Sequence, residues 1–313
     1  MTLDLQVAST FATVLLNLAF AIAVGATMTW LWLAGGASAW SATQLTKARR
    51  TGLGAIAVAL LAMSMLLFFV SASMAEVPLS QANEAVSAML TGSHFGLAWS
   101  IGVGALFVAA ISRVVPASDR QLRAKILLGL AALAVFAYSR SMISHASANG
   151  DFNAATVADW IHLCLISVWV GEVFIAGLST LSGAVAEQLA DREDAVRYIE
   201  NLSASATFAL GGIFVTGLFS AWHNLGSLAG LSGNVYGTAL IVKVAMVAFA
   251  ALLGGFNRFL VMPKLLAALR SPGQLEQSGL RTFTLILRIE AVVLLAILVA
   301  AAILSATSPP TAA

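Results

Sequence analysis

Charged side chains and cysteines are both scarce in this chain. Only 10% of its 313 residues are charged, 60% are apolar, and the mean hydropathy is +0.93. Soluble domains carry about 25% charged residues, so most of the surface is predicted to face lipid rather than water. The single cysteine, Cys164, excludes an internal disulfide and any Cys-x-x-Cys metal site.

Several functional motifs are missing as well. The sequence has no Gly-x4-Gly-Lys-Ser/Thr phosphate-binding loop and no Asp-Lys-Thr-Gly phosphorylation sequence, so ATP-driven pumping by this chain is not expected. The histidines lack the His-Glu-x-x-His spacing of hydrolytic zinc sites, and we do not expect an enzyme. The formal charge is +2 and no basic run exceeds Lys47-Ala48-Arg49-Arg50, so no nucleic-acid partner is expected.

Long apolar runs dominate what is present. A membrane-spanning helix needs about 20 largely apolar residues. Eight segments meet this requirement, at 9–34, 52–75, 92–115, 124–145, 155–181, 203–223, 236–262 and 282–306. The predicted fold is therefore all-α, a polytopic membrane helical bundle with eight transmembrane helices. We expect a single integral-membrane domain over residues 1–313, with a short additional helix within 76–91.

The distribution of cationic residues predicts the orientation. Apart from Arg140, Lys243 and Arg288, every Lys and Arg lies on or beside the first, third, fifth or seventh connection between spans. Cytoplasmic connections carry the excess of Lys and Arg, so both termini are predicted to lie outside the cytoplasm. No Lys or Arg precedes the first apolar run, which is therefore expected to be a membrane helix rather than a cleaved signal.

All four histidines are predicted to lie toward the outer face, at His94, His145, His162 and His223. Neutral imidazole binds copper, zinc and haem iron, and thioether ligands favour Cu(I). Met142 precedes His145 by three residues and so shares its helical face. His145, His162, Met142 and His94 are the candidate metal ligands, whereas His223 is better explained as an interfacial side chain.

Polar residues inside the predicted spans form a second candidate set, a transport path or coupling site. Its members are Trp169, Glu172, Lys243, Arg288 and Glu290. A carboxylate inside a membrane usually faces the bundle interior and has a partner. Lys243 and Arg288 are possible partners of Glu172, so the set predicts either structural ion pairs or a route for conduction or coupling.

Small residues recur every four positions on the third span, at Gly92, Gly96, Ser100 and Gly104. This spacing lets a second helix approach closely, and the prediction is structural. The first four spans do not convincingly repeat in the last four, so an inverted-repeat transporter is not predicted.

The second half of the chain resembles the CopD family of bacterial copper-resistance inner-membrane proteins. The matching pieces, in order, are Ser144-His145-Ala146-Ser147, Asp159-Trp160-Ile161-His162, Trp169-Val170-Gly171, Val215-Thr216-Gly217-Leu218, Val235-Tyr236-Gly237-Thr238 with Lys243, and Gly255-Phe256-Asn257-Arg258-Phe259. The likeness is good over 140–305 and looser over the N-terminal four-helix half, 1–139. The family usually has paired glycines after the tryptophan, whereas Glu172 follows Gly171 here.

This resemblance implies a multi-pass protein of the bacterial inner membrane that handles a copper ion. It implies copper uptake from the periplasm toward the cytoplasm, with a periplasmic carrier of the CopC type as a possible partner beside the lipid bilayer. His145 and His162 sit on the family's histidine positions, and Met142 and His94 are lesser candidates. Trp169, Glu172, Lys243, Glu290 and Arg288 would then line or brace the route inward.

Two other functions remain open from the sequence. Two histidines on adjacent helices can ligate one b-type haem, which a Soret band in the purified protein would reveal. Alternatively, the chain delivers copper to a membrane oxidase as an assembly factor, with the acidic segment 183–202 as a docking surface. Co-purification of oxidase subunits, lost on replacing that segment, would support this second alternative.

Overall fold

The computed structural model describes residues 2–116, 118–181, 192–225, 235–271 and 277–305. The fold within these ranges is all-α, and eight helices are long and apolar enough to cross a membrane, which confirms the predicted class. The eight spans are Leu5–Leu33, Ala39–Met74, His94–Val114, Arg120–Ser141, Ala154–Thr180, Arg192–His223, Gly237–Arg270 and Ser278–Ser305.

The spans belong to helices whose bounds often extend past the apolar cores. They are α1 (Thr2–Leu33), α2 (Ala39–Met74), α4 (His94–Val114), α5 (Asp119–Ser141), α6 (Ala154–Ile175), α8 (Arg192–Leu225), α9 (Val235–Phe256) and α11 (Gln277–Ser305). Two π-helices, η3 (Ala176–Thr180) and η5 (Asn257–Val261), continue α6 and α9. Shorter elements are η1 (Leu79–Gln81), α3 (Asn83–Gly92), η2 (His145–Asn149) and α10 (Met262–Arg270).

Several predicted helix starts were wrong, most clearly that of α2. The apolar run predicted a start at residue 52, but Ser38 caps a helix that begins at Ala39, and its side chain accepts from the Ser41 backbone N–H. Lys47, Arg49 and Arg50 are therefore helical rather than part of a loop. Hydropathy locates the apolar part of a helix, whereas capping determines where the helix begins.

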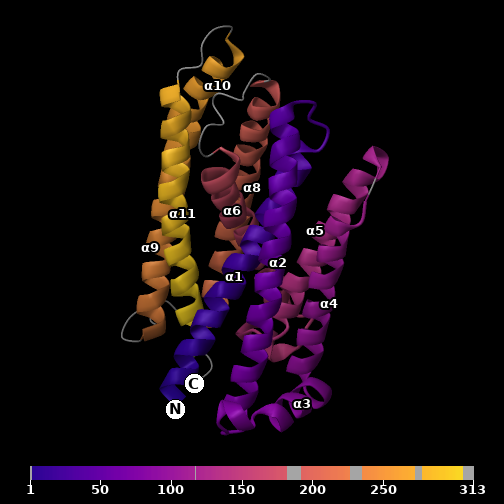
Figure 1. Cartoon of the computed structure of the whole chain (residues 1–313). Coiled ribbons are helices and arrows are strands. Elements are labelled where there is room, and N and C mark those ends of the chain that lie inside the picture. The colour runs from indigo at the N-terminus through magenta and orange to yellow at the C-terminus, as the bar shows by residue number, and fades with distance from the viewer. Residues whose placement is uncertain (1, 117, 182–191, 226–234, 272–276, 306–313) are drawn as a thin grey trace.

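The two ends of the bundle carry different accessory helices. Figure 1 places α3 and the start of α1 at one end, and α10 at the other. We call these the α3 end and the α10 end. The segment 76–91 was predicted to contain a short helix, and η1 and α3 confirm it.

Helices α1 and α6 lie between the two halves of the bundle (Figure 1). One apolar core joins α1 with α2, α4 and α5, and it includes Leu16 and Phe136. A second core joins α6 with α8, α10 and α11, and it includes Val170 and Leu294. Because α1 and α6 contribute side chains to both cores, their packing sets how the halves are joined.

The crossing of α1 and α6 depends on two glycines. A Cβ added at Gly25 would overlap the backbone of Gly171, and one added at Gly171 would overlap the backbone of Ala21 and Gly25. Neither overlap can be relieved by turning a side chain. In the predicted stripe on the third span, Gly96 lies against the backbone of Met89 and Leu90 in α3, whereas Gly92 and Gly104 have open space around them.

Arg113 fastens α4 to α1 near the α10 end. Its guanidinium is 1% exposed and donates to the carbonyl oxygens of Ala109 (2.7 Å) and Ala23 (3.0 Å), and to the hydroxyl of Thr27. The sequence placed Arg113 with the connection that follows the third span. It instead satisfies backbone acceptors inside the bundle, so its charge is hydrogen-bonded where it is buried.

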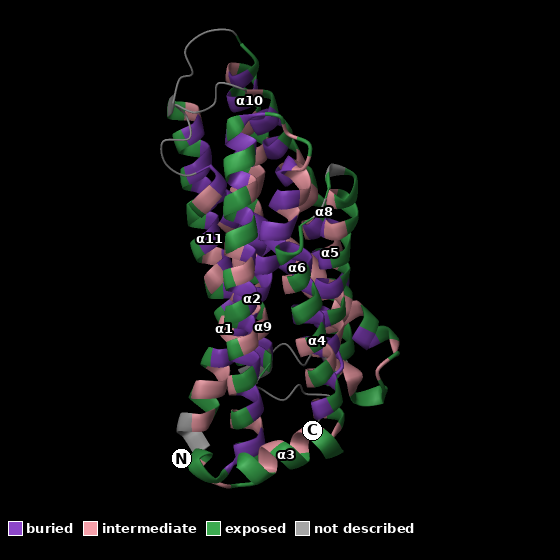
Figure 2. Cartoon of the chain, turned by 45° about the vertical axis from the view of Figure 1, so that its right-hand side comes forward, coloured by how far each residue is buried: buried purple, intermediate pink, exposed green. Residues whose placement is uncertain are grey.

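Many large apolar residues are exposed on the outside of the bundle, and Figure 2 shows exposed positions along several helices. Helix α9 is the clearest case, since Val244, Phe249 and Leu252 are all more than half exposed. It packs mainly against α11 and its own continuation η5. Large apolar side chains on the outward faces fit a lipid environment.

We predict that Gly171→Ala lowers the stability of the folded bundle by about 1–3 kcal/mol, because the new methyl group must push two backbones apart. Thermal unfolding in detergent measures the effect. Gly104→Ala is the control: its Cβ meets nothing within 4 Å, so this exchange should be neutral or stabilising. Equal melting temperatures for the two variants would contradict the proposed role of the crossing.

Candidate metal-binding and transport site

His162 lies on α6, eight residues after its first residue Ala154, and faces α8. Its Nδ1 is 2.8 Å from Oγ1 of Thr216. The Thr216 hydroxyl is also 2.7 Å from the carbonyl oxygen of Gly212, so it can donate there while it accepts from an Nδ1–H of the imidazole. The lone pair of His162 is then on Nε2, the nitrogen that remains for a metal or a proton.

Charged groups from two other helices lie near Asp159, which is one turn before His162 on α6. Oδ2 of Asp159 accepts a hydrogen bond from Ser144 Oγ at 3.1 Å. Arg140 on α5 and Lys243 on α9 are both close enough for their charges to act on Asp159, and Lys243 also acts on His162. The sequence analysis did not select Asp159, although a carboxylate three residues before a histidine within one span was the signal available.

The remaining candidate ligands lie at the α3 end in separate settings. His145 begins η2 and is exposed, whereas Met142 follows the last residue of α5 and is 6% exposed. His94 begins α4, and its Nε2 is 2.9 Å from Oδ2 of Asp151 in the segment before α6. His223, near the end of α8, is exposed and stacks on Phe219 at a centroid distance of 6.3 Å.

These residues do not form a ready-made metal cluster. Among the residues that the structure describes, no three His, Cys, Asp or Glu side chains are grouped so that they could hold one ion. Cys164 is partly buried and packs toward the core of the first half.

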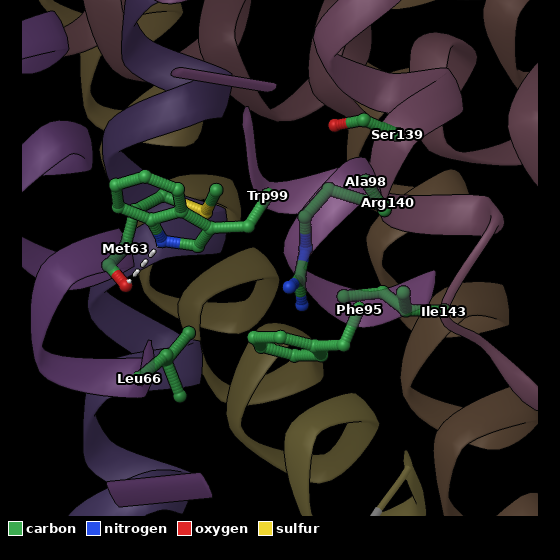
Figure 3. Close-up of a pocket in the computed structure, with 8 residues that line it drawn as sticks. All are labelled: Met63, Leu66, Phe95, Ala98, Trp99, Ser139, Arg140 and Ile143. Carbon is green, nitrogen blue, oxygen red and sulfur yellow. Dashed lines mark hydrogen bonds between the residues drawn. The ribbon is translucent and has the colours of Figure 1, made fainter. Parts of the chain in front are cut away.

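A small cavity beside this region has room for about one water molecule, at ≈ 10 Å³. Figure 3 shows the Arg140 side chain extending into it between Trp99 and Phe95. Trp99 is fixed by a 3.0 Å hydrogen bond from Nε1 to the carbonyl oxygen of Met63. The cavity thus holds a cationic side chain among aromatic rings, and it is too small for a ligated ion.

Two buried carboxyl groups pair with indoles. Trp32 Nε1 donates to Oε1 of Glu172 at 2.9 Å, and Trp169 Nε1 donates to Oε1 of Glu290, also at 2.9 Å. Glu172 is 1% exposed and Glu290 is 2% exposed. Each pair joins α6 to another helix, α1 in the first case and α11 in the second.

The predicted ion partners of Glu172 were wrong. Lys243 acts on Asp159 and His162, and Arg288 donates from Nε to the carbonyl oxygen of Gly177 at 3.0 Å. In the described part of the chain, neither Glu172 nor Glu290 is within 4.0 Å of a cationic group. The partner of each carboxyl is an indole from a distant part of the sequence, which helix periodicity cannot identify.

Both π-helices supply groups to this inner region. Gly177 of η3 offers the carbonyl that binds Arg288, and Asn257 opens η5 and donates from Nδ2 to the carbonyl oxygen of Phe283 at 3.3 Å. A π-turn interrupts the regular helical bonding pattern and is often found at functional positions. The sequence analysis did not select Asn257, although it lies in one of the family-like segments.

We predict that Trp32→Phe lowers stability by about 1–3 kcal/mol, because it leaves Oε1 of Glu172 buried without its donor. The double variant Trp32→Phe/Glu172→Leu should be less destabilised than the sum of the two single changes. Thermal unfolding in detergent measures this difference, with Trp222→Phe as the control at a 66% exposed position. Strict additivity would contradict the pairing.

Comparisons with known proteins cover most of the chain. A model described as "copper resistance protein D-like, N-terminal domain" matches residues 3–155, and one described as "copper resistance protein D" matches residues 196–304. The copper transport protein CutJ of Bacillus subtilis (strain 168) is 28% identical over 165 residues, which are 52% of this chain and 30% of CutJ. This chain therefore aligns with less than a third of that relative. No solved structure matches. With the eight-helix fold and the two matches, the chain belongs to the copper resistance protein D (CopD) family.

Proposed function

We propose that this protein takes up copper from the periplasmic side of a bacterial inner membrane and moves it toward the cytoplasm. Membership of the copper resistance protein D family and the likeness to a copper transport protein support this proposal. Copper is the cargo, and the chain performs no chemical conversion of it. The eight apolar helices supply the membrane-spanning body that such movement requires.

The orientation in this proposal follows from charge. The α10 end carries Lys264 and Arg270 on α10, and also the cationic segment of α2 around Arg49. Cytoplasmic surfaces are enriched in Lys and Arg, so we assign the α10 end to the cytoplasm and the α3 end to the periplasm. Both chain termini are then periplasmic, and the histidines lie on the side from which copper arrives.

The hydrogen bonding and the location of His162 are the main support for the proposal. Its Nδ1–H is fixed by Thr216, its Nε2 is left as a lone-pair donor, and it lies within the membrane span at the periplasmic half. Neutral imidazole is a good copper ligand when its other nitrogen is oriented by a hydrogen bond. We propose that His145 joins His162 when copper binds, with Met142 and His94 close by in the same outer region.

Beyond His162, the inward route follows α6 toward the cytoplasm. Trp169 and Glu172 lie two and three turns further along α6, and Glu290 and Arg288 approach from α11. Lys243 stands beside His162 at the start of this route. Buried polar side chains inside a membrane bundle commonly mark ion paths. A periplasmic carrier of the CopC type is the proposed donor at the α3 end.

We predict that His145→Ala and His162→Ala together reduce copper uptake into proteoliposomes at least tenfold, because the outer site loses both imidazoles. Uptake of the metal is followed by elemental analysis of washed vesicles. His223→Ala is the matched control, since this exposed histidine stacks on Phe219 outside the proposed route. Unchanged uptake in the folded double variant would overturn the proposed function.

Substitutions of Thr216 test separately whether its hydroxyl orients His162. Thr216→Val removes the hydroxyl and should weaken copper binding by about 10- to 100-fold, the usual effect of losing a group that orients a metal ligand. Thr216→Ser keeps the hydroxyl and should bind nearly as the wild type does. Equilibrium competition with a copper chelator gives both affinities, and equal weakening by Val and Ser would show that the hydrogen bond is irrelevant.

A further inference from the structure

A second, larger cavity lies in the α10-side half of the bundle, between α6, α8, α11 and the α9–η5 segment. Its volume is ≈ 210 Å³, enough for several water molecules. Most of its lining is apolar, including Leu210 and Phe283, but Asn257, Arg258 and Glu290 also face it. Water in a cavity needs polar partners, and these three residues provide them.

The side-chain oxygen of Asn257 accepts no hydrogen bond from the described residues. The residue is 3% exposed, and its Nδ2 donates to the carbonyl oxygen of Phe283. Its Oδ1 has no hydrogen-bond partner among the described residues. A buried amide oxygen left unpaired is costly, so an occupant of the cavity that donates a hydrogen bond would stabilise this arrangement.

Glu290 offers one satisfied oxygen and one that is not hydrogen-bonded in the described part of the chain. Oε1 accepts from Trp169 Nε1, and a Cβ added at Gly254 would lie 3.3 Å from this same oxygen, so the carboxyl group lies directly against α9. Gly254 is three residues before Asn257. The Glu290 carboxyl from α11 therefore lies against the α9–η5 segment about one turn before Asn257.

The neighbouring charged groups are engaged elsewhere. Arg258 donates from one nitrogen to the carbonyl oxygen of Ser203 (2.6 Å), to Ser203 Oγ (2.7 Å) and to Thr207 Oγ1 (2.7 Å). Arg288 on α11 binds the carbonyl oxygen of Gly177, and Glu172 on α6 is paired with Trp32. The other charged pair nearby, Arg270 on α10 with Glu200 on α8, is exposed, and Lys243 acts on Asp159 and His162.

We propose that this cavity is a hydrated proton-binding site with Glu290 as its proton carrier. When Glu290 is protonated, Oε1 keeps the hydrogen bond from Trp169, and the O–H on Oε2 donates through cavity water to Oδ1 of Asn257. Release breaks the O–H bond, leaves its electron pair on the carboxylate and transfers the proton to a water molecule. Trp169 and Asn257 are positioning residues, since they orient the carboxyl group and its water.

This proposal rests on the proposed copper transport for its physiological role. A cation passing inward along α6 repels a bound proton, so its approach favours release of the proton from Glu290. After the cation leaves, the carboxylate takes up a proton again. Copper keeps its oxidation state in this cycle, and one proton is exchanged for each cation that passes.

The first test requires no copper. Infrared difference spectra of the full-length protein, recorded between low and high pH, should show loss of a carboxylic-acid C=O band as Glu290 ionises. Glu290→Gln should remove that band, and Asn257→Ala should keep it but shift its frequency, because the acceptor of the O–H is lost. A band that survives unchanged in the folded Glu290→Gln variant overturns the proton site.

The second test separates the proton site from the transport function. Proteoliposomes with a pH-sensitive dye in the lumen report proton movement while copper uptake is measured on the same vesicles. Glu290→Gln should bind copper with wild-type stoichiometry. Its copper-driven pH change should be at least tenfold smaller than that of the wild type. Glu200→Gln is the control, because it neutralises an exposed carboxyl on α8 that lies outside the proposed route and should leave the pH change within twofold.

The outcomes of the two tests are distinguishable. A copper-driven pH change that persists in Glu290→Gln refutes the coupling role of Glu290. Absence of copper uptake by the wild type refutes the proposed transport function, and the infrared result then decides the proton site by itself. Melting curves of both glutamine variants show that each has folded.

Discussion

The contact between the backbones of α1 and α6 at Gly25 and Gly171 is the constraint on which the rest of the structure depends. It brings the two halves of the bundle together without intervening side chains. It also determines what surrounds the next residue, because Glu172 follows Gly171 and meets Trp32 from α1. A helix pair held further apart could not make this hydrogen bond. The glutamate that departs from the usual paired glycines therefore coexists with the close crossing, since Gly171 on α6 and Gly25 on α1 provide the space.

Hydropathy predicted the eight spans because burial in lipid requires long apolar segments whatever the packing. It could not predict where α2 begins, since Ser38 determines that start through a cap. Nor could it show which glycines pack. In the stripe on the third span only Gly96 meets another helix closely, whereas Gly92 and Gly104 face open space. The close crossing instead uses Ala21 and Gly25, also four residues apart, which the sequence analysis did not select.

Partners of the polar residues were harder still to predict. The sequence correctly marked Glu172 and Glu290 as interior groups, but charge complementarity suggested Lys243 and Arg288 as partners. Their actual donors are Trp32 and Trp169, which belong to other helices. An indole N–H neutralises no charge, so no electrostatic pattern in the sequence points to it. Likewise, the packing of η5 against α11 determines that Oδ1 of Asn257 lacks a donor among the described residues, and the sequence does not show this packing.

The sparse packing of α9 has a mechanical consequence. This helix rests mainly on α11, and Gly254 lies against Glu290 at that contact. Lys243 stands about three turns on one side of the contact and Arg258 about one turn on the other. Any tilt of α9 about Gly254 moves those two residues in opposite directions. A change of tilt would therefore link the surroundings of Lys243 to those of Arg258 along the length of one helix.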